Sequence, residues 1–349
     1  MKNKSIVILT GNNKFFGQTR KPWVSMDVDL IEAALKDHGY PVRQYTFSQV
    51  INRAIPVHDA IIFYTFSQKS NRREYLRDAV YFLNSSTNIL IPSIELLHCH
   101  ENKGFQELYK RQLGMHSLQA FYFSSAAEIF EHDIKYPVVF KTVTGSNAKG
   151  VFLAHSEKEL LKIIGTVRPR QYATSLDLIR RKYFRKKKSY KEYPDYNNLT
   201  DLHQYKDYIL KEVNFILQEF VPDLSFDYRV LTLFDRYFIV RRATKEDDFR
   251  ASGAKRFSLV EDADDRLLEY ARKIYNKFDT PFLSMDICQK GDDFYLLEFQ
   301  ALHFGVNVLV KNNGYYVREN SCWRFKPLDR ISIEEEISRA LIGYIGALK

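Results

Sequence analysis

The hydrophobic pattern of the first 95 residues alternates between two periods. Three short apolar runs have the length and composition of buried strands: Ser5–Thr10, residues 60–65 and residues 88–91. Two segments between them repeat apolar side chains at helical spacing: residues 28–38 and residues 72–83. Gly39 and Pro41 follow the first helix as typical stop signals. This order of elements predicts a small parallel sheet, which would bind a ligand at the loops 11–17 and 64–70 after its strands.

The rest of the chain continues the mixture of strands and helices. Apolar runs predict strands at residues 121–124, 136–141, 151–154, 215–221, 228–234 and 237–242. Helical spacing predicts helices at residues 94–113, from residue 126 onward, and at residues 157–164, 264–278 and 333–348. Residues 166–206 show only one helical pattern, at 176–187, and we interpret them as an insertion or mobile loop. The predicted fold class is α/β (α+β).

The most informative pattern is a predicted hairpin between residues 282 and 300. Two apolar runs flank the polar segment 289–293, which supplies a glycine for the turn. If the pairing is centred on Asp292, Asp286 lies opposite Glu298, and Ser284 lies opposite Gln300. Because side chains alternate along a strand, this register predicts that Asp286, Glu298 and Gln300 share one face.

Two carboxylates that face each other on apolar strands destabilise a sheet unless their charges are neutralised. A hard divalent cation would neutralise them, and the amide oxygen of Gln300 would complete an all-oxygen set of ligands. The alternative is a polar edge that faces solvent. The apolar residues around these positions favour a buried sheet, so the sequence predicts a metal site formed by Asp286, Glu298 and Gln300.

Composition and charge narrow the class of protein. The chain has 349 residues, of which 45% are hydrophobic, and this is enough for one large domain or several smaller ones. The three cysteines are far apart, and no apolar run is long enough for a signal peptide or a membrane span. We therefore expect reduced thiols and a cytoplasmic protein. The sequence leaves open whether the protein is a homodimer.

The net charge of +9 comes from one segment. Between Arg168 and Lys191 there are ten basic residues and one acidic residue, Asp177, so the remainder has 42 of each sign. A charge confined to one segment argues against a protein that coats nucleic acid, and we expect no nucleic-acid partner. The segment instead suggests a large anionic partner, such as an acidic peptide, an anionic glycan precursor or a membrane surface. The alternative, to which the sequence gives the same weight, is that the segment is a solvated loop without a partner.

Three further groups of residues suggest phosphate chemistry. Lys141 ends a predicted strand, and the small-residue loop 142–150 that follows it contains Lys149, an arrangement that can hold a phosphate. The strand ending in Gln218-Glu219-Phe220-Val221 runs into Pro222. Several arginines gather downstream: Arg229, Arg241, Arg242 and Arg250. Each group also has a structural alternative, namely a surface loop, a core strand and a set of salt bridges. Because Arg241 and Arg242 are consecutive on a strand, at most one faces a common site.

Taken in order, these segments resemble a known superfamily. The succession PVVFKTVTGSNAKGV, ILQEFV, DYRV, VRRAT, DDFRAS, SMDI and LLEFQ resembles the ATP-grasp enzymes, especially carboxylate–amine ligases similar to glutathione synthetase and to ribosomal-protein glutamate ligases. The resemblance covers roughly residues 95 to 345. It implies three domains: a pre-ATP-grasp domain at 1–95, a small ATP-grasp subdomain at 96–221 with the insertion 166–206, and a large subdomain at 222–349 with the metal site.

The resemblance also implies roles for individual residues. Lys103 and Lys141 resemble the two nucleotide lysines, and Thr144, Gly145, Ser146 and Lys149 fall in the lid over the triphosphate of ATP. Gln218, Glu219, Phe220 and Val221 resemble the hinge that binds adenine, and Asp227 falls near a ribose-binding position. Asp286, Glu298 and Gln300 match the Mg²⁺ ligands, with two ions expected. Arg241 or Arg242, Arg250 and Ser252 fall where the superfamily binds the γ-phosphate and the acyl phosphate.

The implied function is ATP-dependent formation of an amide through an acyl phosphate, with a peptide or an anionic glycan precursor as acceptor. The chain departs from the family pattern at Gln300, where asparagine is usual, and at 302–305, where a Pro-Gly pair is common. These departures leave the substrate open. Two alternatives remain: a non-catalytic ATP-binding module, and a nucleic-acid-binding protein that uses the basic insertion. The presence of Lys103, Lys141, Asp286 and Glu298 argues against the first.

Overall fold

A computed structural model describes most of the chain. The described residues are 4–17, 21, 23–52, 55–67, 69–145, 149–168, 176–177, 179–184, 195, 197–209, 212–244, 248–250, 256–303 and 305–348. They form two compact units. The larger unit consists mainly of Met1–Leu118 and Val221–Lys349, and the smaller unit of Gln119–Gly145 and Lys149–Phe220. Among the described residues, no helix is long and apolar enough to cross a membrane.

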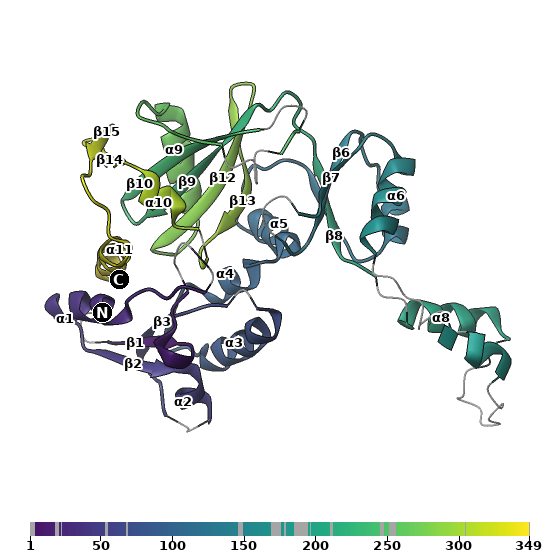
Figure 1. The fold of residues 1–349 in the computed structure, drawn as a ribbon, viewed down its shortest axis with the longest axis horizontal. Coiled ribbons are helices and arrows are strands. Elements are labelled where there is room, and N and C mark those ends of the chain that lie inside the picture. Colours follow the sequence, from purple (N-terminus) through teal and green to yellow (C-terminus); the bar gives the residue numbers. More distant parts are fainter. Residues whose placement is uncertain are drawn as a thin grey trace. The chain divides into compact units, whose positions relative to one another are not determined.

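The larger unit begins with a four-stranded parallel sheet in the order β2-β1-β3-β4 (Figure 1). Its strands are β1 (Ser5–Thr10), β2 (Val42–Thr46), β3 (Ala60–Tyr64) and β4 (Ile89–Ile91). Its helices are η1 (Asn12–Lys14), α1 (Val28–Asp37), α2 (Phe47–Asn52), α3 (Ser70–Leu83) and α4 (Ile94–Cys99). The predicted parallel sheet is confirmed. The sequence prediction omitted β2, because this edge strand is mostly polar and only Val42 is buried.

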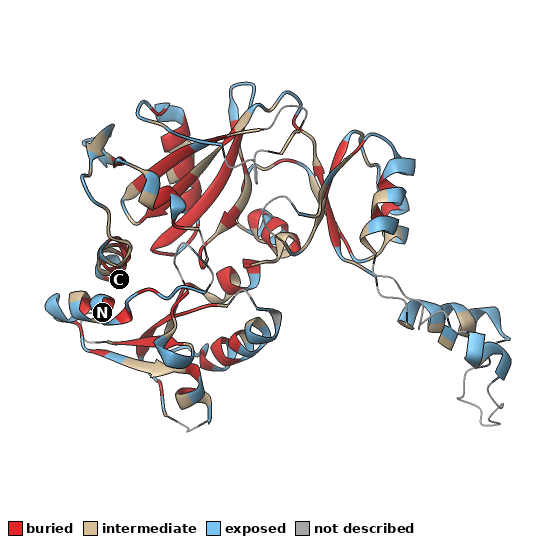
Figure 2. Cartoon of the chain, viewed as in Figure 1, coloured by how far each residue is buried: buried red, intermediate tan, exposed pale blue. Residues whose placement is uncertain are grey.

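A second, mostly antiparallel sheet has the strand order β13-β12-β9-β10-β14-β15, with β11 paired to β10. Its strands are β9 (Phe226–Leu233), β10 (Arg236–Ala243), β11 (Phe257–Leu259), β12 (Phe282–Lys290), β13 (Asp293–Gln300), β14 (Gly314–Glu319) and β15 (Cys322–Pro327). The helices of this part are α5 (Lys103–Gln112), α9 (Asp265–Tyr275), α10 (Asn307–Lys311) and α11 (Ile333–Ala347). Helix α9 packs on the sheet through Leu267, Leu268 and Ala271, which are buried. Figure 2 shows where the buried and exposed parts of the chain lie.

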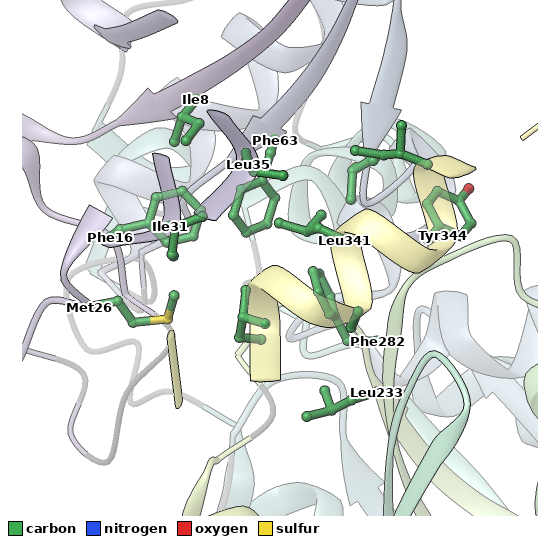
Figure 3. Packing of buried hydrophobic residues seen from close by; sticks show 14 of the residues in the cluster. Ile8, Phe16, Met26, Ile31, Leu35, Phe63, Leu233, Phe282, Leu341 and Tyr344 are labelled. Atoms are coloured by element: carbon green, nitrogen blue, oxygen red, sulfur yellow. The ribbon is translucent and has the colours of Figure 1, made fainter. Parts of the chain in front are cut away.

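One core cluster joins the two sheets of the larger unit. Ile8 and Phe63 come from the parallel sheet, Phe282 from β12, and Leu341 from α11 (Figure 3). Helix α11 also lies against α1. The C-terminal helix therefore packs between the N-terminal part of the chain and the antiparallel sheet, and the two form one compact unit.

The smaller unit contains an antiparallel sheet in the order β5-β8-β6-β7. Its strands are β5 (Ala120–Phe123), β6 (Val138–Thr142), β7 (Val151–Ala154) and β8 (Phe215–Glu219), and its helices are η2 (Ala126–Glu131), α6 (Glu157–Val167), η3 (Arg180–Phe184) and α8 (Leu199–Ile209). Helix α6 contributes Leu160 and Ile164 to the core of this unit. By contrast, no described residue between 176 and 209 is buried.

The predicted elements differ from the observed ones in several further places. The structure also contains β11, β14, β15, α2 and α10, which the sequence analysis did not predict. The helix predicted at 94–113 is two helices, α4 and α5, and the one expected from residue 126 is the short 3₁₀ helix η2. Part of the segment expected to be a loop forms α8, and much of the basic stretch lies outside the described residues. The division into three domains stays a prediction.

Candidate functional site

The hairpin of β12 and β13 has the predicted register from Ser284 to Asp286, the part that carries the proposed metal ligands. Asp286 pairs with Glu298 and Ser284 pairs with Gln300. A bulge between Asp286 and Ile287 then shifts the register by one residue toward the turn. Opposed residues of antiparallel strands lie on the same face of the sheet. The predicted grouping of Asp286, Glu298 and Gln300 on one face is therefore confirmed, while their role as metal ligands stays a prediction.

Asp286 is neutralised by arginines from the neighbouring strands. Strand β9 places Arg229 directly beside Asp286, and its Nε and Nη2 donate to the two carboxylate oxygens at 2.7 and 2.8 Å. Arg242 of β10 reaches the same carboxylate at 2.9 Å. The sequence argument had assigned this neutralisation to a metal alone, and the structure corrects that premise. The sequence analysis named Arg229 among the downstream arginines but gave it no role at this site, although its spacing from Asp227, two residues along one strand, placed it on the same face.

Arg242 lies between two buried carboxylates. Its Nε and Nη2 both donate to Asp227 at 2.6 Å, and all three residues of this group, Arg242, Asp227 and Asp286, are less than 10% exposed. Although burial alone would raise the pKa of Asp286, the charges of Arg229 and Arg242 hold it below its usual range. Asp286 is therefore an ionised carboxylate that needs no deprotonation to bind a cation.

Arg241 lies on the opposite face of the sheet from Arg242. It is exposed, and its guanidinium is 3.6 Å from the centre of the Phe226 ring. The register pairs Arg241 with Tyr228 and Arg242 with Asp227, as alternation requires. Of the two arginines that the sequence left as alternatives, Arg242 is the one that shares a face with Asp286.

Helix α5 brings a lysine to the edge strand β13. Gln106 accepts a hydrogen bond from the backbone N–H of Phe299 at 3.3 Å, and Lys110 donates to the carbonyl of Leu296 at 3.2 Å. These contacts satisfy backbone groups at the free edge of the sheet. Lys103, one turn before Gln106, lies 3.8 Å from the carboxylate of Glu298. The helix therefore adds a positive charge beside the proposed metal ligands.

The residues around Gln300 fit an oxygen-liganded cation. The Oε1 atom of Gln300 is buried and has no hydrogen-bond partner, whereas its Nε2 donates to Glu298 at 3.3 Å. The Glu298 side chain is 31% exposed and therefore accessible. Within the described ranges, no three His, Cys, Asp or Glu side chains converge as a metal site, so the predicted set depends on the amide. Carboxylate and amide oxygens together suit Mg²⁺.

The smaller unit holds the second predicted lysine. Lys141, on β6, donates to the side chain of Gln218 on β8 at 2.6 Å. The loop that follows places Thr144 and Lys149 at the surface, and Gly145 has a positive φ of 118°. Ser146 lies outside the described residues. A lysine next to an exposed glycine-containing loop is the arrangement that the sequence predicted.

The predicted hinge falls where the chain passes between the two units. Phe220 is the last residue of the smaller unit, and Val221 belongs to the larger one. Just before this point, the backbone of Glu219 donates to Gln119, and Gln119 donates back to the Glu219 carboxylate. Gln218 is buried at the end of β8.

Two predicted catalytic residues, Arg250 and Ser252, remain to be placed. Arg250 forms an ion pair with Asp248 at 2.8 Å, and Ser252 lies outside the described residues. His303, near the end of β13, could serve as a base for the incoming amine. It is half-buried, burial lowers its pKa, and its Nδ1 contacts the carbonyl of Gly17 at 3.2 Å. This contact indicates a structural histidine.

Comparison with known proteins supports the fold. No protein-family model and no curated protein matches the chain. Among solved structures, the ATP-grasp ligase PsnB complexed with a minimal precursor is 14% identical, with 98% of this chain and 99% of that chain covered and a TM-score of 0.50. The complex of PsnB with minimal precursor, Mg and ADP is 12% identical, with 98% of each chain covered and the same TM-score. A RimK domain ATP-grasp protein from Sphaerobacter thermophilus is 12% identical over 84% of this chain and 90% of that chain, with a TM-score of 0.49. The chain has the ATP-grasp fold.

Proposed function

We propose that the chain is an ATP- and Mg²⁺-dependent carboxylate–amine ligase. The observation that carries this proposal is the grouping on one face of the large sheet: Asp286, Glu298 and Gln300 supply oxygen ligands, and Arg229, Arg242 and Lys103 surround them with positive charge. A metal–polyphosphate complex needs both kinds of group, because ligand oxygens hold the cation while basic side chains meet the phosphate charge.

In this proposal, Glu298, Gln300 and Asp286 hold one or two Mg²⁺ ions, which supply charge neutralisation at the phosphates. Arg229 and Arg242 keep Asp286 ionised and fix the direction of its carboxylate. The resemblance suggested that Asp227 binds ribose. Both of its oxygens accept hydrogen bonds from Arg242, and we therefore propose that it positions this arginine instead.

Each unit contains residues to which this proposal gives a nucleotide-binding role. The smaller unit contributes Lys141 toward the phosphates and the loop with Thr144, Gly145, Ser146 and Lys149 as a lid. Gln218, Glu219, Phe220 and Val221 bind adenine, mainly through backbone groups. The larger unit contributes Lys103. The support is the pairing of Lys141 with Gln218 and of Lys103 with Glu298, since each lysine is held in place by another proposed site residue.

The proposed reaction has two steps. A substrate carboxylate oxygen attacks the γ-phosphorus of ATP, ADP leaves, and an acyl phosphate forms. An amine nitrogen then attacks the acyl carbon, phosphate leaves, and the nitrogen loses a proton to give the amide. No protein nucleophile takes part, so catalysis depends on positioning and charge stabilisation, to which Arg242, Arg250 and Ser252 contribute.

We propose a peptide as the acceptor. The solved complexes of PsnB with a precursor support this choice, since that ATP-grasp ligase holds a peptide precursor. The basic segment between Arg168 and Lys191 favours an acidic peptide, and an anionic glycan precursor is the alternative with the same charge.

A second candidate is an ATP-binding module without ligase activity. The observation in its favour is that Asp286 already accepts two hydrogen bonds from Arg229 and forms an ion pair with Arg242. These contacts compete with metal coordination, because they use about three of the four lone pairs of the carboxylate and offset the charge that would attract Mg²⁺.

The test compares the native protein with Glu298→Ala and, as a matched control, Glu319→Ala, which removes a carboxylate from β14. A ligand that binds only the folded state raises the melting temperature. We expect Mg-ATP to stabilise the native protein and the control but not Glu298→Ala. Release of ADP in the presence of acidic peptides and amines then separates a ligase from a binding module. An unchanged response in Glu298→Ala would overturn the proposed site.

A further inference from the structure

Buried polar atoms without partners gather at one place in the larger unit. Four such atoms belong to three residues: Nε of Arg77, Nδ1 and Nε2 of His100, and Oε1 of Gln300. Elsewhere in the described part of the chain, the four remaining atoms of this kind belong to four separate residues. Native proteins satisfy nearly all buried polar groups, so a group of unsatisfied ones indicates a polar guest. The nucleotide residues proposed above do not use Arg77 or His100.

These three residues come from different elements and meet at the end of β13. Arg77 of α3 donates through Nη2 to the backbone carbonyl of His100 at 3.1 Å. The His100 ring, 2% exposed, packs edge-on against Phe66 with ring centres 4.0 Å apart. The Gln300 amide lies close enough to the same ring to raise the pKa of His100 against the larger, opposite effect of burial. No hydrogen bond of good geometry joins the two side chains, and Gln300 donates to Glu298 through Nε2. The group therefore adjoins the proposed metal ligands.

Arg77 is a cation without a carboxylate partner within 4 Å among the described residues. Its neighbour Arg73 lies 3.8 Å from Glu101, but Arg77 makes no such contact. Burial lowers the pKa of Arg77, and the charge of Arg73 acts in the same direction. A half-buried guanidinium in these surroundings favours an incoming anion.

We propose that Arg77 and His100 form a subsite for a carboxylate of the substrate, in the chemical class of acidic amino acids and acidic peptide side chains. The proposal rests on the proposed ligase function and names its acid substrate. Arg77 Nε and one ring nitrogen of His100 donate to the two carboxylate oxygens. The location beside Gln300 places the substrate next to the proposed metal ligands.

The test uses the full chain and four defined probes. L-Glutamate and L-aspartate carry a side-chain carboxylate, and L-glutamine and L-asparagine replace it with an amide of nearly the same shape. Binding is measured by calorimetry and by melting temperature, with and without Mg-ATP. We expect at least one acid to bind about tenfold more tightly than its amide, because a charge-assisted hydrogen bond is worth that factor or more.

Three variants decide whether Arg77 carries this preference. Arg77→Met should lose it, whereas Arg43→Met, which removes an exposed arginine from β2, should keep it. If Arg77→Met fails to fold, Arg77→Lys preserves the charge but removes the Nε donor, and the preference should fall severalfold. Equal binding of acids and amides, no binding of any probe, or an unchanged preference in Arg77→Met and Arg77→Lys overturns the proposal.

The response to Mg-ATP separates this subsite from the proposed nucleotide site. Arg77→Met should retain the full stabilisation by Mg-ATP while it loses the response to the acids. If the variant loses the Mg-ATP response instead, Arg77 belongs to the nucleotide site and the subsite is wrong. If Mg-ATP has no effect even on the native protein, the proposed function fails, while acid binding and its dependence on Arg77 are still measured. If water alone occupies the space between Arg77 and His100, none of the four probes will bind.

Discussion

Arg241 and Arg242 are neighbours in the sequence but meet different surroundings. Arg242 is 4% exposed and neutralises two buried carboxylates, whereas Arg241 is exposed and contacts Phe226. Removing one partner of a buried ion pair leaves an uncompensated charge. We therefore expect Arg242→Ala to lower the free energy of unfolding by about 3–5 kcal/mol.

Arg241→Ala is the matched control for this prediction. It removes the same side chain from the same strand, but it loses only a cation–π contact at an exposed position, worth less than about 1 kcal/mol. Urea unfolding followed by circular dichroism measures both variants. Equal losses of stability in the two variants would contradict the placement of Arg242 between Asp227 and Asp286.

Gly150 occupies a position that a side chain does not fit. Its φ is 75°, and a Cβ added there would lie 2.2 Å from Oγ1 of Thr142. We expect Gly150→Ala to cost about 1–2 kcal/mol from the backbone and about 1–3 kcal/mol from the overlap. Gly165→Ala, in the exposed part of α6 with no atom near the added Cβ, should instead stabilise by about 0.5–1 kcal/mol. Urea unfolding of both variants tests the opposite signs.

The residues of the proposed site differ in how far the sequence determines them. Asp286, Glu298 and Gln300 could be grouped because a hairpin is local and alternation fixes which side chains share a face. The partners of Asp286 could not be assigned, since Arg229 and Arg242 reach it only through the pairing of β12 with β9 and of β9 with β10. Facing carboxylates indicated that a positive charge was needed, but not which group supplies it.

Helix α5 contains a buried ion pair, and the lysine of this pair also donates a hydrogen bond to the edge strand of the large sheet. Lys110 has no exposed surface, and its Nζ lies 2.7 Å from Glu107 as well as near the Leu296 carbonyl. Lys110→Met keeps the length of the side chain but leaves Glu107 without this charge. We expect the free energy of unfolding to fall by about 3–5 kcal/mol, and the Mg-ATP response to weaken because Lys103 is on the same helix.

A double variant separates the charge from the packing. Adding Glu107→Gln to Lys110→Met removes the uncompensated carboxylate, so we expect it to recover more than half of the lost stability. The double-mutant cycle is measured by urea unfolding. Additive losses in the two single variants and the double variant would show that the two side chains do not interact.

The boundaries of α4 and α5 illustrate what helical spacing omits. The sequence predicted one helix at 94–113 because apolar positions recur across the whole segment. The chain breaks at Glu101, whose φ is 52°, and α5 restarts with Asn102, whose side chain accepts a hydrogen bond from the Phe105 N–H. Asparagine is a strong N-cap, so the sequence did contain a signal for a new helix at Asn102, but the apolar periodicity around it is the stronger pattern.

The basic insertion contributes little to the stability of the folded chain. None of its described residues between 176 and 209 is buried, and the core of the smaller unit contains no residue from η3 or α8. Arg168 and Glu212, which flank the segment 169–211, form an ion pair with each other. The end of α6 and the residues before β8 therefore already lie close together on either side of the segment 169–211.

We accordingly expect that residues 169–211 can be replaced by a Gly/Ser linker of about six residues, which spans on the order of 13 Å. The melting temperature should change by less than about 2 °C, because none of the described residues of this segment is buried. The stabilisation by Mg-ATP should remain, while binding of acidic peptides should weaken if the lost cations hold them. A replacement of the same length that changes every lysine and arginine within 169–211 to serine is the control. If both chains lose the acidic peptide equally, its binding depends on charge; if only the shortened chain loses it, the apolar and tyrosine side chains of the insertion make the contact.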